Sequence, residues 1–141
     1  MTLKISLLLA LSISIFTSVT QASNTSALTS IECFGDGQYF QTQFAQNQTG
    51  HFQVPFKFED SNIFSEQIQM MDIDVIITPA GSFSSKMEVR VYKGYYIKAD
   101  LRIGFDISQE LDTEGTLVKY LKNIFVLNQR PVGNCIVTQG Y

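Results

Sequence analysis

Residues 95–107 read Tyr-Tyr-Ile-Lys-Ala-Asp-Leu-Arg-Ile-Gly-Phe-Asp-Ile, and they decide the fold class. Every second residue of this stretch is apolar, without exception over thirteen residues. A helix, with its period of 3.6, does not space apolar side chains in this way, whereas a strand with one face against a core does. The stretch therefore predicts β structure.

The same alternation recurs along much of the chain. Apolar residues alternate in, or dominate, six further segments: Ile31–Phe34, Gln38–Phe44, Phe52–Phe58, Met71–Ile77, Met87–Val91 and Val132–Thr138. Turn-forming residues separate most of these segments. We therefore expect an all-β domain of about seven or eight strands, a small antiparallel sandwich or barrel. Because Pro55 has no N–H for a ladder, we expect its strand at a sheet edge.

One predicted hairpin can be given a register. A three-residue turn at 92–94 pairs Val91 with Tyr95 on the apolar face and places Gly94 at the left-handed position that such turns need. A two-residue turn would mix the polar and apolar faces. The longer turn also places opposite charges across from each other on the outer face: Glu88 with Lys98, and Lys86 with Asp100.

Two segments fit more than one structure. Residues 61–70 fit a loop or a short helix. Residues 117–124 fit helical spacing and strand spacing about equally, and short apolar runs are not decided by periodicity. We expect a strand over Asn123–Leu127 and leave open a short helix or helical turn before it.

The first 22 residues have the three parts of a secretory signal peptide. Lys4 precedes an apolar stretch, Ile5–Phe16, and small and polar residues follow up to Ala22. The apolar stretch is shorter than the roughly 20 residues that a membrane helix needs, and no later segment approaches that length. We expect cleavage after Ala22, a flexible tail over 23–30, a single domain over 31–141, and a periplasmic or extracellular location.

The chain contains two cysteines, Cys33 and Cys135. An even count in an exported chain predicts a disulfide, which here would tie the first strand to the last. Such a disulfide would close a loop of nearly the whole domain, and in the chain-entropy model a cross-link of that span stabilises the fold by roughly 4–5 kcal/mol. An intermolecular bridge or two free thiols are the alternatives. Neither cysteine has a CxxC partner, so we expect no catalytic thiol.

Net charge excludes some classes of partner. Without residues 1–22 the chain has 9 basic and 13 acidic residues, a formal charge of −4, and no basic run. Such a chain is not expected to bind nucleic acid or an anionic membrane surface. Asn24 and Asn47 begin N-glycosylation sequons, which matter only in a source that glycosylates secreted proteins.

No residue pattern indicates a catalytic or metal centre. His51 is the only histidine, and no GxSxG motif occurs. Asp72, Asp74 and Asp100 are expected to share one outer face, but Lys86 between them would neutralise it, and there is no calcium-loop motif. We expect no catalytic residue, no metal and no cofactor.

Tyr92, Tyr95 and Tyr96 are the candidate binding residues, because tyrosines at a rigid tip suit protein recognition. The alternative is that they pack the turn locally. We expect a small exported, non-enzymatic binding or interaction protein whose partner is another protein, with its oligomeric state open. Two other classes remain: a small carboxylate-dependent hydrolase, and an assembly subunit that adds strands at Phe52–Phe58, against which Pro55 argues.

Overall fold

The computed structural model describes residues 27–59, 69–82 and 86–140. The predicted signal peptide over residues 1–22 lies outside this part of the chain, as do residues 61–68 of the segment that fits a loop or a short helix. Within the described ranges, no helix is long and apolar enough to cross a membrane.

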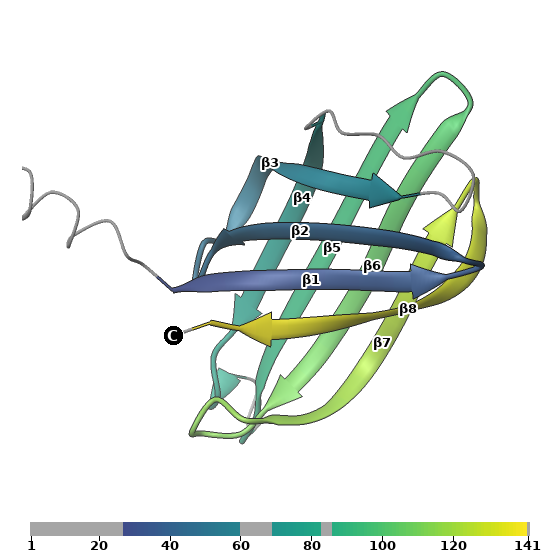
Figure 1. Ribbon diagram of the computed structural model, residues 1–141. Helices are drawn as coiled ribbons and strands as arrows, with labels where there is room; N and C mark the ends of the chain where they lie inside the picture. Colours follow the sequence, from purple (N-terminus) through teal and green to yellow (C-terminus); the bar gives the residue numbers. More distant parts are fainter. Residues whose placement is uncertain (1–26, 60–68, 83–85, 141) are drawn as a thin grey trace, which may run out of the picture.

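Eight antiparallel strands form a closed barrel in which each strand pairs with its sequence neighbours and the last strand pairs with the first (Figure 1). They are β1 (Leu28–Gly35), β2 (Gln38–Ala45), β3 (Gly50–Glu59), β4 (Gln69–Thr78), β5 (Glu88–Lys98), β6 (Leu101–Leu111), β7 (Leu117–Leu127) and β8 (Arg130–Gln139). The all-β prediction is confirmed, the architecture is a barrel, and the described residues contain no α-helix. The first strand begins at Leu28, within the expected flexible tail.

Residues in the left-handed conformation close the tightest turns. Asp36 (φ 58°) and Gly37 (φ 73°) join β1 to β2, and Asn128 (φ 49°) and Gln129 (φ 69°) join β7 to β8. Two successive positive φ values characterise the type I′ turn, whose twist matches that of the flanking strands. These two short turns make β1 and β2, and β7 and β8, antiparallel neighbours.

The hairpin predicted at residues 92–94 is wrong. β5 continues through these residues, and the turn lies at 99–100, so Val91 pairs with Ser108 and not with Tyr95. Gly94 serves packing and not turning, because a Cβ at this position would lie 2.5 Å from the ring of Phe105. A glycine that makes room for an aromatic ring has the same sequence signature as a glycine that allows a turn.

This correction reverses the faces of β5. Tyr92 and Gly94 point into the barrel, whereas Tyr95 and Ile97 lie on the outside with exposed fractions of 49% and 61%. The alternation predicted from residues 95–107 is confirmed in β6, where the apolar residues of 103–107 are buried. The turn at 99–100 interrupts this alternation. Odd-numbered residues point outward before the turn, in β5, and inward after it, in β6.

The ambiguous segment before Asn123 is strand throughout, because β7 is continuous from Leu117. Two bulges explain why its periodicity is ambiguous. Lys122 faces Ser108 and Tyr120 faces Gln109, so one residue of β7 is extra between them, and a second register shift follows nearer the start of the strand. Each bulge moves the apolar residues out of phase.

Apolar side chains from all eight strands fill the barrel. The fully or almost fully buried ones are Ile31, Cys33, Phe40, Phe44, Val54, Phe56, Met71, Ile73, Val75, Tyr92, Ile103, Phe105, Ile107, Leu111, Phe125, Leu127 and Cys135. Phe40 lies at the centre of the aromatic packing, with ring centroids 5.6 Å from both Phe56 and Phe105. Eight strands enclose about the space that such side chains can fill.

The predicted disulfide between Cys33 and Cys135 is confirmed. The two residues face each other across β1 and β8, with their Cα atoms 4.0 Å apart, and both side chains are buried. The bond therefore joins the first and last strands side by side, at the place where the barrel closes (Figure 1).

Candidate functional site

Strand pairing is incomplete at three places in the described barrel. Residues 69–71 of β4 and 96–98 of β5 form no ladder with each other. β2 and β3 pair only through residues 39–42 and 56–59, and β7 and β8 only through 125–127 and 130–133. At each place two long strands separate over the rest of their length. Backbone N–H and C=O groups there lose their ladder partners and need others.

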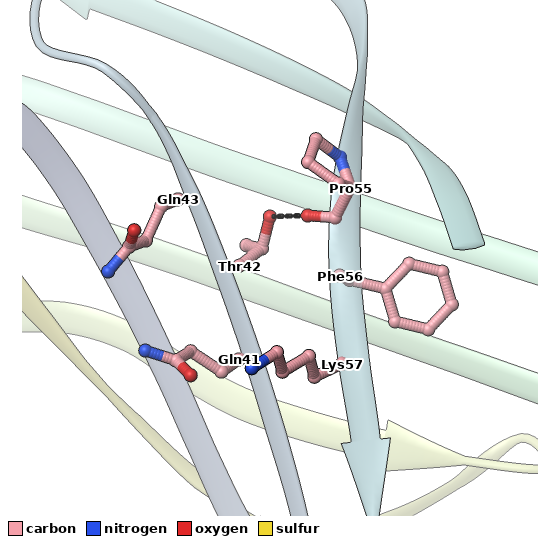
Figure 2. A pocket seen from close by; sticks show the side chains of 6 residues that line it. All are labelled: Gln41, Thr42, Gln43, Pro55, Phe56 and Lys57. Carbon is pink, nitrogen blue, oxygen red and sulfur yellow. Dashed lines mark hydrogen bonds between the residues drawn. The ribbon is translucent and has the colours of Figure 1, made fainter. Parts of the chain in front are cut away.

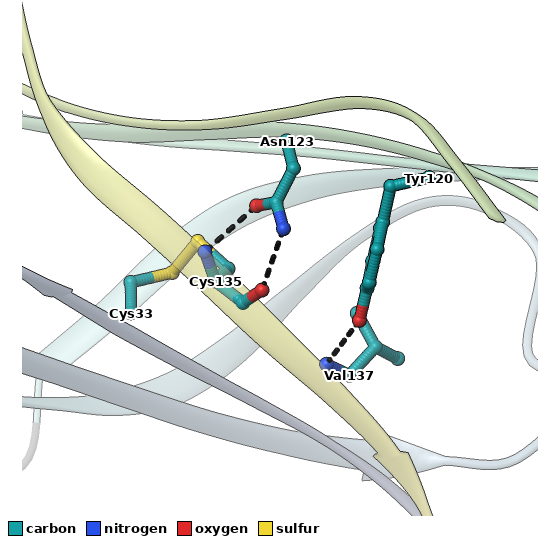
Figure 3. The surroundings of a disulfide bond; sticks show 5 residues. All are labelled: Cys33, Tyr120, Asn123, Cys135 and Val137. Atoms are coloured by element: carbon teal, nitrogen blue, oxygen red, sulfur yellow. Dashed lines mark hydrogen bonds between the residues drawn. A yellow bond between two sulfur atoms is a disulfide. The ribbon is translucent and has the colours of Figure 1, made fainter.

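Side chains of β7 bridge one of these places, the β7–β8 junction (Figure 3). Asn123 Nδ2 donates to the carbonyl oxygen of Cys135 at 2.8 Å, and Asn123 Oδ1 accepts from the Cys135 N–H at 2.7 Å. The hydroxyl of Tyr120 accepts from the N–H of Val137 at 3.3 Å. The β7–β8 junction is therefore closed by hydrogen bonds from side chains.

The other ladder, between β2 and β3, ends at Pro55. The backbone N–H and C=O groups of successive strand residues point to alternate sides of the strand. In β2 the even-numbered residues bond to β1, because Gln46 N bonds to Ala27 O in the same register just beyond the strand end. Odd-numbered residues face β3, and the register would place Gln43 opposite Pro55 next. Pro55 has no N–H to donate to Gln43, and its carbonyl accepts from Thr42 Oγ1 at 2.8 Å.

The residues of β3 that precede Pro55 in the sequence keep one free edge. Their other edge pairs with β4 from Gly50 to Phe56. By the same alternation, the N–H and C=O groups of His51 and Gln53 point away from β4, where no strand partner lies among the described residues. The space between residues 43–45 of β2 and 51–55 of β3 is called the β2–β3 opening.

A pocket of about 320 Å³ lies beside this opening, over the last pairs of the β2–β3 ladder (Figure 2). It is lined by Gln41, Thr42, Gln43, Pro55, Phe56 and Lys57. The amides of two glutamines and the ammonium group of one lysine supply its polar groups, and Lys57 takes part in none of the ion pairs of the described residues. Such a pocket suits a ligand with hydrogen-bonding groups and a modest apolar part.

Tyr96, one of the predicted binding residues, supports this pocket from inside the barrel. Its ring packs edge-on against Phe56 with centroids 4.9 Å apart, and its hydroxyl donates a hydrogen bond to Gln69. Phe56 is 5% exposed, so its ring is held from behind as a fixed part of the wall.

The other two predicted tyrosines lie elsewhere. Tyr92 is 1% exposed and its hydroxyl accepts from Gln139 Nε2 at 3.4 Å inside the barrel. Tyr95 lies on the outer face of β5, opposite Asp72 and Gly104. The three tyrosines therefore do not form one exposed tip, because the turn that would have gathered them does not exist.

Acidic residues of β4 hold the free half of β3 on its outer face. His51 Nδ1 lies 2.8 Å from Asp74 Oδ1, and His51 Nε2 lies 3.5 Å from Asp72 Oδ1. The hydrogen bond with Asp74 raises the pKa of His51 above its ordinary value of 6.5. His51 is thus a strand residue with two carboxylate partners, and these contacts fix β3 to β4 without using its free backbone edge.

The interior of the barrel also holds a polar cluster near one end. Arg90 Nε donates to Glu88 Oε2 at 2.9 Å, and Thr29 Oγ1 donates to Gln139 Oε1 at 2.7 Å. Burial disfavours the charged form of Arg90, but hydrogen bonds with Tyr92 and Glu88 outweigh it and raise the pKa of the guanidinium. These groups satisfy one another, so the cluster is a structural one.

The other sequence candidates for chemistry are not brought together. Asp72 and Asp74 share the outer face of β4, but Asp100 lies in the β5–β6 turn and Lys86 precedes β5. The lysine opposite Asp74 in the β4–β5 ladder is Lys93, and not Lys86. Among the described residues, no group of three or more His, Cys, Asp or Glu side chains is placed to hold a metal ion.

Sequence reasoning did not identify the β2–β3 opening as a site. The polar side chains of the adjoining pocket, Gln41, Gln43 and Lys57, belong to no motif. The one signal was Pro55 within an alternating strand, which predicted an edge. That edge exists in the first half of β3, although the barrel as a whole is closed.

Comparisons of the chain with protein-family models, with curated protein sequences and with solved structures gave no match. The opening between β2 and β3 and its pocket are therefore the features from which a function has to be argued.

Proposed function

We propose that this chain is a small exported, non-enzymatic binding protein, and that it contacts a segment of another protein at the β2–β3 opening. The observation that carries this proposal is the free backbone edge of the first half of β3, beside which the pocket lies. At the β7–β8 junction side chains of β7 bond to the backbone of β8, whereas no contact of this kind to the backbone of His51 or Gln53 is found among the described residues.

The residues around the opening support a binding role. The wall is rigid, because Phe56 is packed between Phe40 and Tyr96, and β3 is tied to β4 along its whole first half. A site held in place before binding loses less conformational entropy when the partner arrives. The polar rim from Gln41 to Lys57 can bond to a partner without covalent chemistry.

A carboxylate-dependent hydrolase is the weaker candidate. Asp72 and Asp74 are the carboxylates nearest to the only histidine, and all three lie on an open outer strand face. A hydrolase needs its acids around a substrate cleft that excludes water. The pocket at the β2–β3 opening is lined by no carboxylate.

A library of random linear peptides displayed on phage tests the proposal. The bait is the disulfide-bonded chain without residues 1–22. We expect recovered peptides to lose affinity about tenfold or more on Gln43→Trp, which fills the pocket with an indole. Val118→Trp is the matched control, because Val118 is a 49% exposed strand residue on β7.

Two results would contradict the proposed site. Recovery of no peptide above background would remove the binding role for extended polypeptides. Equal affinity for the Gln43→Trp and Val118→Trp proteins would keep a binding role and remove the β2–β3 opening as its place.

A further inference from the structure

The backbone of the β2–β3 opening specifies more than a place of contact. His51 and Gln53 each turn an N–H and a C=O away from β4, and Gln43 on the other side turns a carbonyl toward a proline that cannot donate to it. Donors and acceptors that alternate along an edge are what an incoming extended chain pairs with.

We propose that the partner segment binds by strand addition, pairing its own backbone with β3 at His51 and Gln53. This inference rests on the proposed function and adds the chemistry of the ligand: an extended, proline-free stretch of polypeptide with strand-forming residues such as Val or Thr. Only alternate residues of the segment pair with β3, because N–H groups of an extended chain point to alternate sides.

Pro55 is the positioning residue of this site. If residue 55 had an N–H, it could donate to Gln43, and the ladder of β2 and β3 would continue by one more bonded pair. Further pairing toward the turn would bring the edges of β2 and β3 together. The proline therefore keeps the edge of β3 free for a segment of another chain, while Thr42 satisfies the Pro55 carbonyl.

Backbone methylation of the peptide tests this mode of binding. The probe is the peptide recovered most often from the library, synthesised with one N-methyl group at each position in turn. We expect affinity to fall about tenfold at alternate positions, where the lost N–H had bonded to β3, and little at the positions between them. The amide protons of His51 and Gln53 should also exchange more slowly with solvent when the unmodified peptide is bound.

The proline supplies a second test that does not depend on methylated peptides. We expect Pro55→Val to give residue 55 an amide proton protected from exchange in the free protein and to lower peptide affinity about tenfold. Pro131→Val is the matched control, because Pro131 is also an exposed strand proline but lies on β8, paired with Val126.

The outcomes separate the two proposals. Peptides that bind at the Gln43 pocket but tolerate N-methylation at every position would overturn strand addition and leave the proposed function standing. Peptides that bind the Pro55→Val and Pro131→Val proteins equally would overturn the role of Pro55. An absence of any bound peptide would overturn the proposed function itself.

Discussion

The side-chain amide of Asn123 occupies the place of a ladder partner for Cys135, with both of its hydrogen bonds shorter than 3 Å. The cause lies on the other side of Cys135. Cys33 and Cys135 form a pair whose backbone groups point away from each other, so the N–H and C=O of Cys135 face β7. Asn123 reaches across to both groups, and the disulfide is thus flanked by a satisfied backbone (Figure 3).

Replacing Asn123 tests this arrangement. We expect Asn123→Ala to lower the free energy of unfolding by about 2–3 kcal/mol, because two hydrogen bonds are lost and the part-buried backbone of Cys135 loses its partners. Urea denaturation measures the change. Thr138→Ala, at an exposed position further along β8, is the control and should change stability by less than about 0.5 kcal/mol. Equal effects of the two substitutions would contradict the bridging role.

The disulfide should contribute much of the stability of this barrel. It closes a loop with a sequence separation of 102 residues, for which the chain-entropy model gives about 4–5 kcal/mol. We expect the Cys33→Ala, Cys135→Ala protein to lose about that amount in urea denaturation. Because both cysteines are at most 2% exposed, dithiothreitol should reduce the native bond only at the rate of unfolding or local opening. Rapid reduction of fully folded protein would contradict this burial.

His51 provides a titration that can be followed alone, since the chain has a single histidine. Its raised pKa means that the folded state binds the proton more tightly than the unfolded state. The resulting stabilisation is fully present below pH 6.5 and is lost as the pH rises through the folded-state pKa. An NMR titration of the imidazole should show that Asp74→Asn lowers the pKa, whereas Asp100→Asn, in the β5–β6 turn, leaves it unchanged. A pKa insensitive to Asp74→Asn would contradict the pairing.

Gly94 on β5 and Gly104 on β6 lie close together but should differ sharply in how well they tolerate substitution by alanine. A Cβ on Gly94 would meet the Phe105 ring at 2.5 Å and Met71 Cε at 3.1 Å, whereas a Cβ on Gly104 would meet only the Gly94 carbonyl oxygen, at 3.4 Å. We expect Gly94→Ala to cost about 1–3 kcal/mol by overpacking the core. Gly104→Ala should cost less than about 0.5 kcal/mol. Thermal unfolding of the two variants measures the difference. Similar unfolding midpoint temperatures would contradict the packing role of Gly94.

Alternation was enough to predict the fold class and the approximate number of strands, and the even cysteine count in a chain with a signal peptide was enough to predict the disulfide. The barrel was left undecided against a sandwich, because both present the same alternating faces along each strand. The phase of β5 was missed for a more specific reason. Val89, Val91, Tyr95 and Ile97 alternate on the outer face of β5, interrupted only by Lys93. The inward positions are held by Tyr92, Gly94 and part-buried Arg90, which read as polar or turn-forming.

The β2–β3 opening could be predicted only in part. Pro55 indicated an edge, and half of β3 has one. A closed barrel retains this edge because the first half of β3 pairs only with β4 and the second half pairs with β2. Such an arrangement depends on three strands at once, so the sequence of β3 alone does not reveal it. The proposed role of the tyrosines depended on a turn at Gly94, and the structure places only Tyr96 beside the pocket.

The ring of strands closes through β1 and β8, which has a consequence for the order of events during synthesis. β1 is made first, and one of its two partners, β8, is made last. The growing chain can form the hairpins from β1 to β7 in turn, but the far edge of β1 stays unpaired and Cys33 has no partner until the final strand emerges. Barrel closure and cross-linking therefore both wait for the last strand, and a chain truncated before Cys135 would lack the disulfide and most of the β1–β8 ladder, which leaves an edge of the sheet exposed.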